Sequence, residues 1–144
     1  MTIGEKISAL KAISLEVLFD DTIRDNEKDI LDLNRVQMYD EGTLDVTKPG
    51  KIERYSPLTI KAKKRAPFNK TDHITLKWMG AFHASLKLLI FKTKIVISSD
   101  NNIWDKYLEP QDRFTRALGL TSENMNKLKD IVQTGVTKKL RNVI

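Results

Sequence analysis

Residues 72–98 read DHITLKWMGAFHASLKLLIFKTKIVIS, and this stretch decides the fold class. Large apolar residues occupy alternate positions over residues 74–78 and again over residues 82–90, with mostly polar residues between them. A period of two is typical of a β-strand that buries one face. Residues 94–98 predict a further strand, and the polar pair at 92–93 predicts the turn that precedes it.

Gly80 interrupts this alternation between Trp78 and Phe82. A glycine at such a break predicts a tight turn or a bulge between two strands, because glycine adopts backbone conformations that other residues avoid. We therefore expect a small antiparallel β-sheet that is built on a hairpin over about residues 73–98.

A helical period precedes the hairpin. Apolar residues recur every three or four positions over residues 3–17, and Thr2 and Glu5 have the spacing of a capping box at the start of a helix. Helical structure is expected over residues 2–40, and it ends where Gly42 supplies a left-handed terminal residue. The sequence leaves open whether this region is one helix or two.

A loop and a short helix are expected over residues 43–66, with Ser56 as the predicted cap of the helix. The C-terminal region over residues 103–144 is expected to be helical, and Thr121 is the predicted cap of its last helix. Gly135 lies inside that helix, where glycine lowers stability by about 1 kcal/mol relative to alanine. It therefore predicts a bend or a close packing contact.

No internal repeat and no low-complexity linker divides the chain, so residues 1–144 are expected to form a single domain. Its expected class is α+β, with long N-terminal and C-terminal helices packed against the small antiparallel sheet. A domain of this length buries roughly two thirds of the surface of its unfolded chain, so it needs no disulfide or metal to fold.

The composition excludes several classes of protein. The chain has 144 residues, of which 40% are hydrophobic and 31% are charged, as in globular proteins. It contains no cysteine, so disulfide scaffolds, thiolate metal sites and cysteine nucleophiles are excluded. No apolar run approaches the roughly 20 residues of a membrane span, and residues 1–21 lack the uninterrupted apolar core of a signal peptide. We expect a soluble, unexported protein of a reducing compartment, with no membrane partner.

Residues that could carry catalysis do not occur in a recognisable pattern. The two histidines are His73 and His83, and only Asp72 is close to them in sequence, so we expect a structural role rather than a metal site. The chain has no His-Glu-x-x-His motif, no glycine-rich phosphate loop and no nucleophile elbow. A nuclease is the enzyme class most worth testing, but most acidic residues follow one another along a solvated helical face. We expect no enzymatic activity, no cofactor and no metal.

Charge is distributed unevenly along the chain, whose net charge is +6. Residues 1–50 hold six Lys and Arg against eleven Asp and Glu, residues 51–100 hold eleven against three, and residues 101–144 hold eight against five. A basic middle suits binding to nucleic acid. An acidic end with a basic middle also predicts two surfaces that attract each other, within one chain or between copies. This second interpretation accounts for both parts of the asymmetry.

Two charged clusters are the candidate contact residues. The basic cluster lies on the predicted short helix, so that at least three positive charges project together towards phosphates or an acidic protein surface. An ordinary solvated helix face is the alternative interpretation. The acidic cluster lies in the N-terminal helical region and is the candidate for the opposite side of a contact. The basic cluster is Lys61, Lys63, Lys64 and Arg65, and the acidic cluster is Asp25, Asp29 and Asp32.

Four short strings follow one another in an order and spacing that resemble a known family. They are ILDLNRVQ at 30–37 with YDEG at 39–42, YSPLTIKAK at 55–63, DHITLKWMGAFHAS at 72–85, and GLTSE at 119–123. Together they cover roughly residues 28–144, whereas the first 27 residues carry no match, and Met79 stands where the family has threonine. The family comprises small virion proteins of crAss-like and related tailed phages of Bacteroides-type bacteria. Its members are similar to tail-completion and head–tail connector proteins.

The resemblance implies an α+β fold without catalysis or cofactor. It also implies subunits that form a closed ring of six or twelve copies in the phage neck or tail, next to the portal and neighbouring neck or tail proteins. Packaged DNA would lie nearby, and the expected location is the virion, after assembly in the host cytoplasm. The charge asymmetry suits a head-to-tail contact in such a ring, with the acidic cluster facing Lys61, Lys64 and Arg65 of a neighbour. A small basic nucleic-acid-binding protein is the alternative hypothesis.

Overall fold

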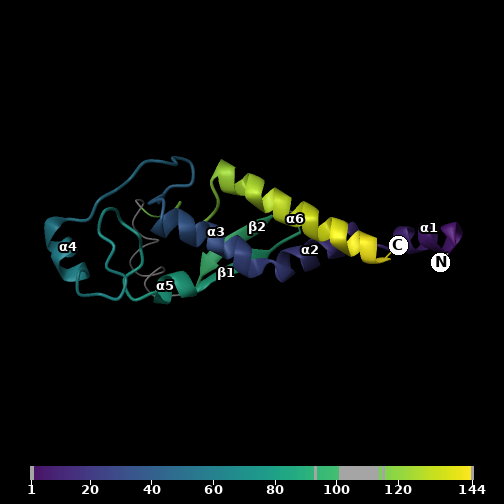
Figure 1. Ribbon diagram of the computed structural model, residues 1–144, viewed down its shortest axis with the longest axis horizontal. Helices are drawn as coiled ribbons and strands as arrows, with labels where there is room; N and C mark the ends of the chain where they lie inside the picture. Colours follow the sequence, from purple (N-terminus) through teal and green to yellow (C-terminus); the bar gives the residue numbers. More distant parts are fainter. Residues whose placement is uncertain (1, 93, 101–113, 115, 144) are drawn as a thin grey trace.

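Helices and long loops surround one β-hairpin in the computed structural model, which describes residues 2–92, 94–100, 114 and 116–143. The fold belongs to the expected α+β class, with a long C-terminal helix and a small antiparallel sheet. The shape is elongated, with α4 at one end and α1 at the other end beside the last part of α6 (Figure 1). In chain order the elements are α1 (Ile3–Lys11), α2 (Leu15–Asp25), α3 (Glu27–Tyr39), α4 (Pro57–Lys63), α5 (Ala81–Ala84), β1 (Leu86–Ile90), β2 (Ile95–Ser99) and α6 (Ser122–Val143).

The predicted hairpin is present in a shortened form. Strands β1 and β2 pair antiparallel, from Leu86 opposite Ser99 to Ile90 opposite Ile95. This register places the alternating large apolar residues of both strands on one face of the sheet. The predicted turn at 92–93 includes residue 93, which lies outside the described residues.

Residues 74–78 do not form the strand that their alternation predicts. The backbone N–H of Thr75 donates to the hydroxyl of Tyr55 at 3.0 Å, and the hydroxyl of Thr75 accepts the N–H of Lys77 at 3.1 Å. Leu76 has a φ of +55°, which a β-strand excludes. The prediction was wrong because side-chain hydroxyls take the backbone groups that a neighbouring strand would have used.

The predicted strand over residues 82–90 begins only at Leu86. The residues before it form the single helical turn α5, in which the neighbours Phe82 and His83 are both buried. A strand sends consecutive side chains to opposite faces, whereas a helical turn can bury two in succession. This part of the sequence therefore follows tertiary packing and not its period of two.

The N-terminal helical region consists of three helices. The apolar period over residues 3–17 is interrupted after Lys11, and Ser14 begins α2 by accepting the N–H of Val17 at 3.4 Å. Asn26 then separates α2 from α3. A serine that satisfies a free N–H of the first helical turn favours a new helix start, which an apolar period alone does not reveal.

Several predicted helix boundaries are confirmed by their local geometry. Thr2 and Glu5 form a capping box, with bonds of 2.6 Å to the N–H of Thr2 and 3.1 Å to the N–H of Glu5. Ser56 and Thr121 each accept the N–H of the residue three positions later at 3.3 Å. Gly42, just after α3, has a φ of +69°, the left-handed conformation expected at a helix end.

The predicted C-terminal helix is confirmed as α6. Of the helical region expected over residues 103–144, residues 103–113 lie outside the described part, and residues 116–119 form a turn and bends. Gly135 marks a close contact between α6 and α2, because a Cβ added there would lie 2.4 Å from the Cγ2 atom of Thr22.

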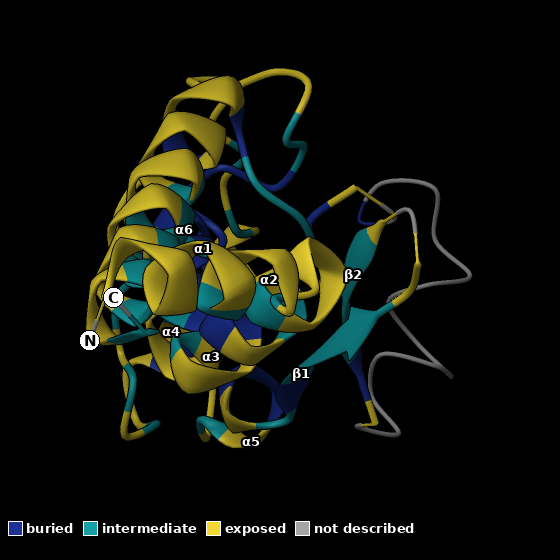
Figure 2. Ribbon diagram, turned by 90° about the vertical axis from the view of Figure 1, so that its right-hand side faces the viewer, coloured by how far each residue is buried: buried dark blue, intermediate teal, exposed yellow. Residues whose placement is uncertain are grey.

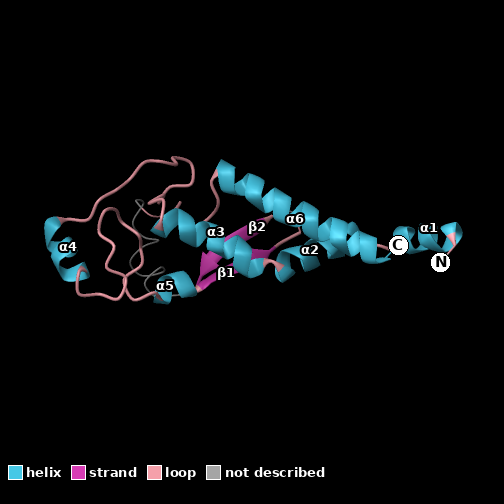
Figure 3. Ribbon diagram, in the orientation of Figure 1, coloured by secondary structure: helices cyan, strands magenta, loops and turns pink. Residues whose placement is uncertain are grey.

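The core lies where α3 comes against β1 (Figure 2). On the other side of the molecule α2 packs against α6. Long loops before and after α4 carry that helix away from the core (Figure 3). Among the described helices, none has the length and apolar character needed to cross a membrane. The buried apolar cluster consists of Leu31, Met38, Leu44, Ile74, Phe82, Leu86, Phe114 and Ala117.

Candidate functional site

The predicted basic cluster lies on and just after α4, at one end of the molecule (Figure 1). Lys61, Lys64 and Arg65 are exposed to solvent. Within the part of the chain that the structure describes, none of these three side chains forms an ion pair. Their charges are therefore accessible to an acidic partner.

Lys63 does not belong to this exposed cluster, which corrects the sequence-based prediction. Its side chain is fully buried, and its Nζ donates to the carbonyl of Lys77 at 2.9 Å and to the carbonyl of Phe68. The rings of Tyr55 and Trp78 lie 5.6 Å and 5.8 Å from the same ammonium group. Burial lowers the pKa of Lys63. Lys63 thus links α4 to the loop that precedes α5. One of the two carbonyls that it binds, that of Lys77, lies 14 residues further along the chain.

Leu58 is the residue of α4 that the sequence analysis missed. Its side chain is 80% exposed, although it is large and apolar. Leu58 precedes Lys61 by three positions and Arg65 by seven, so the three share one side of the helical path. That path continues beyond α4, since the N–H of Arg65 donates to the carbonyl of Ala62 at 3.3 Å. We call Leu58, Lys61 and Arg65 the α4 face; the spacing itself could have revealed it.

The predicted acidic cluster is not one continuous surface. Asp25 ends α2, and its carboxylate accepts a 2.6 Å hydrogen bond from Lys139 of α6. It lines a cavity between α2 and α6 that neither Asp29 nor Asp32 reaches. Asp25 therefore stabilises the packing of these helices and does not extend the surface formed by the other two carboxylates.

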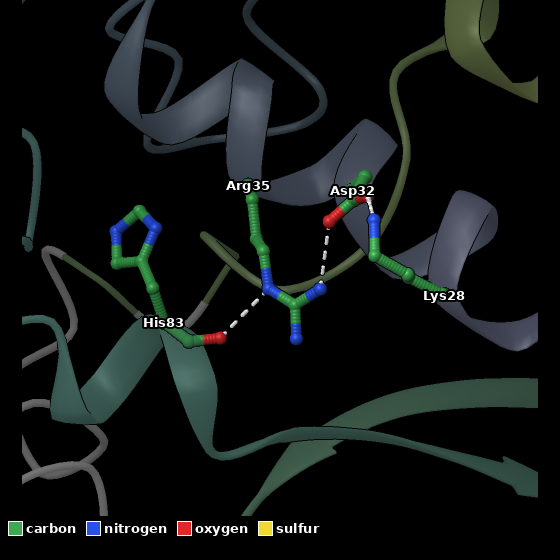
Figure 4. Close-up of polar contacts among 4 residues, drawn as sticks. All are labelled: Lys28, Asp32, Arg35 and His83. Atoms are coloured by element: carbon green, nitrogen blue, oxygen red, sulfur yellow. Dashed lines mark hydrogen bonds and ion pairs between the residues drawn. The ribbon is translucent and has the colours of Figure 1, made fainter.

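Asp32 of α3 lies at the centre of a chain of polar contacts (Figure 4). Its carboxylate accepts hydrogen bonds from Lys28 at 2.7 Å and from Arg35 at 2.8 Å. These two cations hold the pKa of Asp32 below its ordinary value. Arg35 also donates through Nε to the carbonyl of His83 at 2.8 Å, and so ties α3 to α5. Asp32 is thus already paired, whereas Asp29 forms no ion pair within the described residues.

A groove of about 370 Å³ runs between α3 and α6 and contains both of these carboxylates. Its apolar lining includes Val36, which is 43% exposed in the last turn of α3. The groove therefore combines an apolar floor with two carboxylates and one lysine. We call it the α3–α6 groove; its lining residues are Asp29, Asp32, Leu33, Val36, Asn124, Lys127 and Ile131.

A second unpartnered surface is the apolar side of α1. Ile3, Ile7 and Leu10 are 79%, 47% and 42% exposed, and α1 contains no buried residue. Their spacing of four and three places them on one side of the helix, as in a helix that packs against another surface. The apolar period over the residues of α1 therefore lies on one side of a helix, but within the described residues no other element buries this side.

A larger apolar cavity, of about 720 Å³, opens between α2, the hairpin and the start of α6. Phe19 and Ile23 of α2 form one wall, and Leu88 and Ile97 of the hairpin form another. The charges at its rim are mixed, with acidic side chains on α2 and lysines after β1. The cavity therefore offers apolar surface, but its rim carries both acidic and basic side chains and does not favour a partner of either charge.

Gly80 adopts a φ of +90°, so a left-handed glycine at this break in the pattern is confirmed. The prediction that Gly80 lies between two strands is wrong, because residues 74–78 form no strand and Gly80 instead precedes the first residue of α5. A Cβ added at Gly80 would lie 2.8 Å from the Cε2 atom of Phe68. Both the backbone conformation and the space at this turn therefore require glycine.

Both histidines are buried in the loop region around α5. His73 packs its ring against Gly42, where a Cβ would lie 2.8 Å from the ring. The Nε2 atom of His83 lies 2.9 Å from the carbonyl of Thr75, and burial lowers the pKa of His83 from 6.5 to about 4. In the described part of the chain no three His, Asp or Glu side chains converge as a metal site would require.

Comparison of the chain with models of protein families, with curated proteins and with solved structures found no match in any of the three.

Proposed function

We propose that the protein is a structural virion subunit, which forms a homo-oligomeric ring in the head–tail connector, neck or tail of a tailed phage. The observation that carries the assembly role is the exposed apolar side of α1. It is formed by Ile3, Ile7 and Leu10, and no residue of α1 is buried. A stripe of this kind at helical spacing is typical of a surface that a partner covers.

The strings behind the family resemblance support the same proposal, because polar residues in them form buried hydrogen bonds that connect distant parts of this chain. Asn34 and Gln37, in the first string, are fully buried and hydrogen-bond the segment that leads into α6. The last string, at 119–123, is that same segment. Two strings that are far apart in sequence therefore form one structural unit.

The elongated shape also supports a ring subunit. The exposed cations follow Leu58 at one end of the molecule, and the apolar side of α1 lies at the other (Figure 1). A ring repeats one heterologous contact, so each subunit needs two different surfaces. The absence of a converging catalytic pattern from the sequence agrees with a purely structural role.

The experiment compares purified phage particles that carry the wild-type chain or the triple variant Lys61→Glu, Lys64→Glu, Arg65→Glu. Mass spectrometry is expected to find wild-type peptides in the particles, and electron microscopy to find the chain in a ring of the neck or tail. The triple variant is expected to fold and to be missing from particles. Particles that lack the wild-type chain would overturn the virion assignment, and a full complement of the triple variant would remove the basic cluster from the contact.

The exposed cations at Lys61, Lys64 and Arg65 also favour a second candidate, a small nucleic-acid-binding protein. Contacts to phosphates release counterions, so the affinity for DNA would fall steeply as the salt concentration rises. In that case the triple variant loses DNA binding and still enters particles normally, or no particle contains the chain at all. Filter binding at two salt concentrations separates the candidates.

A further inference from the structure

We propose that the α4 face of one copy binds in the α3–α6 groove of a second copy. The inference rests on the homo-oligomeric assembly proposed above and names the two surfaces that form its contact. Both surfaces belong to this chain. Within the described residues, Leu58 is not buried, and Lys61, Arg65 and Asp29 form no ion pair.

The apolar parts of the two surfaces match. Leu58 projects from α4 with 80% of its side chain exposed, so no described residue buries it. The groove offers Leu33 and Val36 of α3 and Ile131 of α6 as an apolar floor. A single large side chain that enters a groove between two helices is a common anchor of a protein contact.

The charges of the two surfaces are complementary. Lys61 and Arg65 follow Leu58 along the α4 face, and Asp29 is the carboxylate of the groove that forms no ion pair within the described residues. Asp32 already holds two cations of its own chain, so the charge match depends on Asp29. The one cation of the lining, Lys127, lies 3.9 Å from the carboxylate of Glu123. Among the charged side chains of the lining, Asp29 is therefore the one without an ion pair in the described residues, and a cation of a neighbouring copy can approach it.

The positions of the surfaces require a second copy. In Figure 1, α4 lies at one end of the molecule, whereas α3 and α6, whose residues line the groove, lie along its middle, so the α4 face is remote from the groove of its own chain. Two different surfaces that complement each other between copies produce a head-to-tail contact, which repeats until it closes. This is the kind of contact that a ring needs.

Leu58 favours a protein partner over nucleic acid. Phosphate contacts need only cations, and an exposed leucine beside the cations gains nothing from a phosphate backbone. In a contact with the groove, the same leucine loses exposed apolar surface while Lys61 and Arg65 approach carboxylates. The combination of residues on the α4 face is thus explained by the groove and not by DNA.

Disulfide trapping tests the contact directly, because the chain contains no cysteine of its own. Leu58→Cys and Val36→Cys are placed together in the full-length chain, and concentrated protein is oxidised. We expect a ladder of disulfide-linked species on a non-reducing gel. The matched control joins Leu58→Cys to Phe91→Cys, a position that is 51% exposed but lies outside the groove. Equal ladders from both pairs would overturn the proposal.

Mixing two single variants tests the head-to-tail arrangement. Chains with only Leu58→Cys and chains with only Val36→Cys, oxidised together, are expected to form linked dimers and nothing larger, because each carries one half of the contact. Either variant oxidised alone is expected to remain a monomer. Dimers that form from Leu58→Cys alone would show a symmetric contact and would overturn the proposal.

Charge exchange tests the pairing of Lys61 with Asp29. Lys61→Asp or Asp29→Lys alone is expected to lower the trapping yield about fivefold, and the two together in one chain to restore it. If DNA were the natural occupant of the α4 face, Lys61→Asp would abolish DNA binding and Asp29→Lys would leave trapping unchanged. That result would overturn the inference.

The inference and the proposed function fail in different ways. A ring in particles without selective trapping of Leu58 on Val36 leaves the function intact and refutes this contact. Selective trapping of a chain that is absent from particles leaves the contact intact and refutes the virion role.

Discussion

The side-chain oxygen of Gln37 accepts a 2.6 Å hydrogen bond from the side-chain amide of Asn124, which lies 87 residues further along the chain. The same oxygen accepts the N–H of Thr121 at 3.0 Å, and the amide nitrogen of Gln37 donates to the carbonyl of Gly119 at 3.0 Å. Asn34, one turn earlier, accepts the N–H of Gly119 at 3.0 Å. Two side chains of α3 thus hold the backbone that starts α6.

We expect Gln37→Leu to lower the free energy of unfolding by about 2–4 kcal/mol, because it leaves several buried polar groups of residues 119–124 without partners. Denaturation by urea measures this loss. The control is Gln133→Leu on the exposed side of α6, which is expected to change the free energy by less than about 0.5 kcal/mol. Equal effects of the two variants would show that the Gln37 bonds contribute little.

Gly135→Ala tests the contact between α6 and α2. Alanine favours the helix by about 1 kcal/mol, but its Cβ would lie 2.4 Å from the Cγ2 atom of Thr22. We expect a net loss of about 1–2 kcal/mol. Thr22 cannot easily rotate away, because its hydroxyl donates to the carbonyl of Leu18 at 2.7 Å.

A double-mutant cycle isolates this contact. Thr22→Ser removes the Cγ2 atom of Thr22 and keeps the hydroxyl, so Gly135→Ala in that background is expected to be neutral or stabilising. Thermal unfolding of the four proteins supplies the coupling energy. If Gly135→Ala costs the same in both backgrounds, the overlap with Thr22 is not what excludes a side chain from Gly135.

Lys63→Met is expected to destabilise the protein by about 2 kcal/mol, since the carbonyls of Phe68 and Lys77 lose their charged donor. Lys64→Met is the matched control, because Lys64 is the exposed neighbour and is expected to tolerate the change. Equilibrium denaturation compares the two. A stable Lys63→Met protein that fails in assembly would instead place Lys63 in a contact surface.

The free energy of unfolding is expected to decrease as the pH is lowered, because His83 is buried in its neutral form. Its folded pKa of about 4 lies below the ordinary 6.5, so the unfolded chain binds a proton first as the pH decreases. The stabilising contribution is complete above about pH 6.5 and is lost as the pH falls through 4, with about 2 kcal/mol lost between pH 7 and pH 5. Urea denaturation at both pH values measures the change.

The variant His83→Gln identifies the contribution of this histidine. Glutamine can donate to the carbonyl of Thr75 but does not titrate, so the loss between pH 7 and pH 5 should be smaller by about 2 kcal/mol than in the wild type. If both proteins lose the same stability, other groups account for the pH dependence.

Gly80→Ala and Gly50→Ala separate backbone strain from crowding. The two glycines have similar φ values of +90° and +87°, so both variants pay about 1 kcal/mol for the left-handed conformation. Only at Gly80 would the new Cβ meet the ring of Phe68, whereas Gly50 faces open space. Thermal unfolding should therefore show a larger loss at Gly80. A larger loss at Gly50 would contradict the crowding at Phe68.

Local signals in the sequence were sufficient for the helix starts at Thr2, Ser56 and Thr121, because each cap bonds a residue only three positions away. The pairing of β1 with β2 also follows from adjacent segments. These features depend on neighbours in sequence, which a pattern of residue types can represent.

Other features depend on partners distant in sequence. Thr75 looked like the polar position of a strand, but the hydroxyl of Tyr55 binds its backbone. Lys63 looked like one more surface cation, but the carbonyl of Lys77, 14 residues away, holds it inside the molecule. The α3–α6 groove likewise exists only once the two helices pack. A pattern of neighbouring residue types carries no information on contacts with residues that are distant in sequence. The burial of Lys63 and the groove could therefore not be predicted from it.

The nine residues of α1 form a helix in which no residue is buried. An isolated helix shorter than about 12–15 residues is marginally stable in water, because its nucleation costs more entropy than its few hydrogen bonds return. Among the described residues, α1 is supported by its capping box and by its contact with the last part of α6. In the assembly proposed above, a partner that covers Ile3, Ile7 and Leu10 would couple the ordering of this helix to the burial of its apolar side in one cooperative step. The proposed assembly would thus stabilise a helix to which the interior of its own chain contributes no buried side chain.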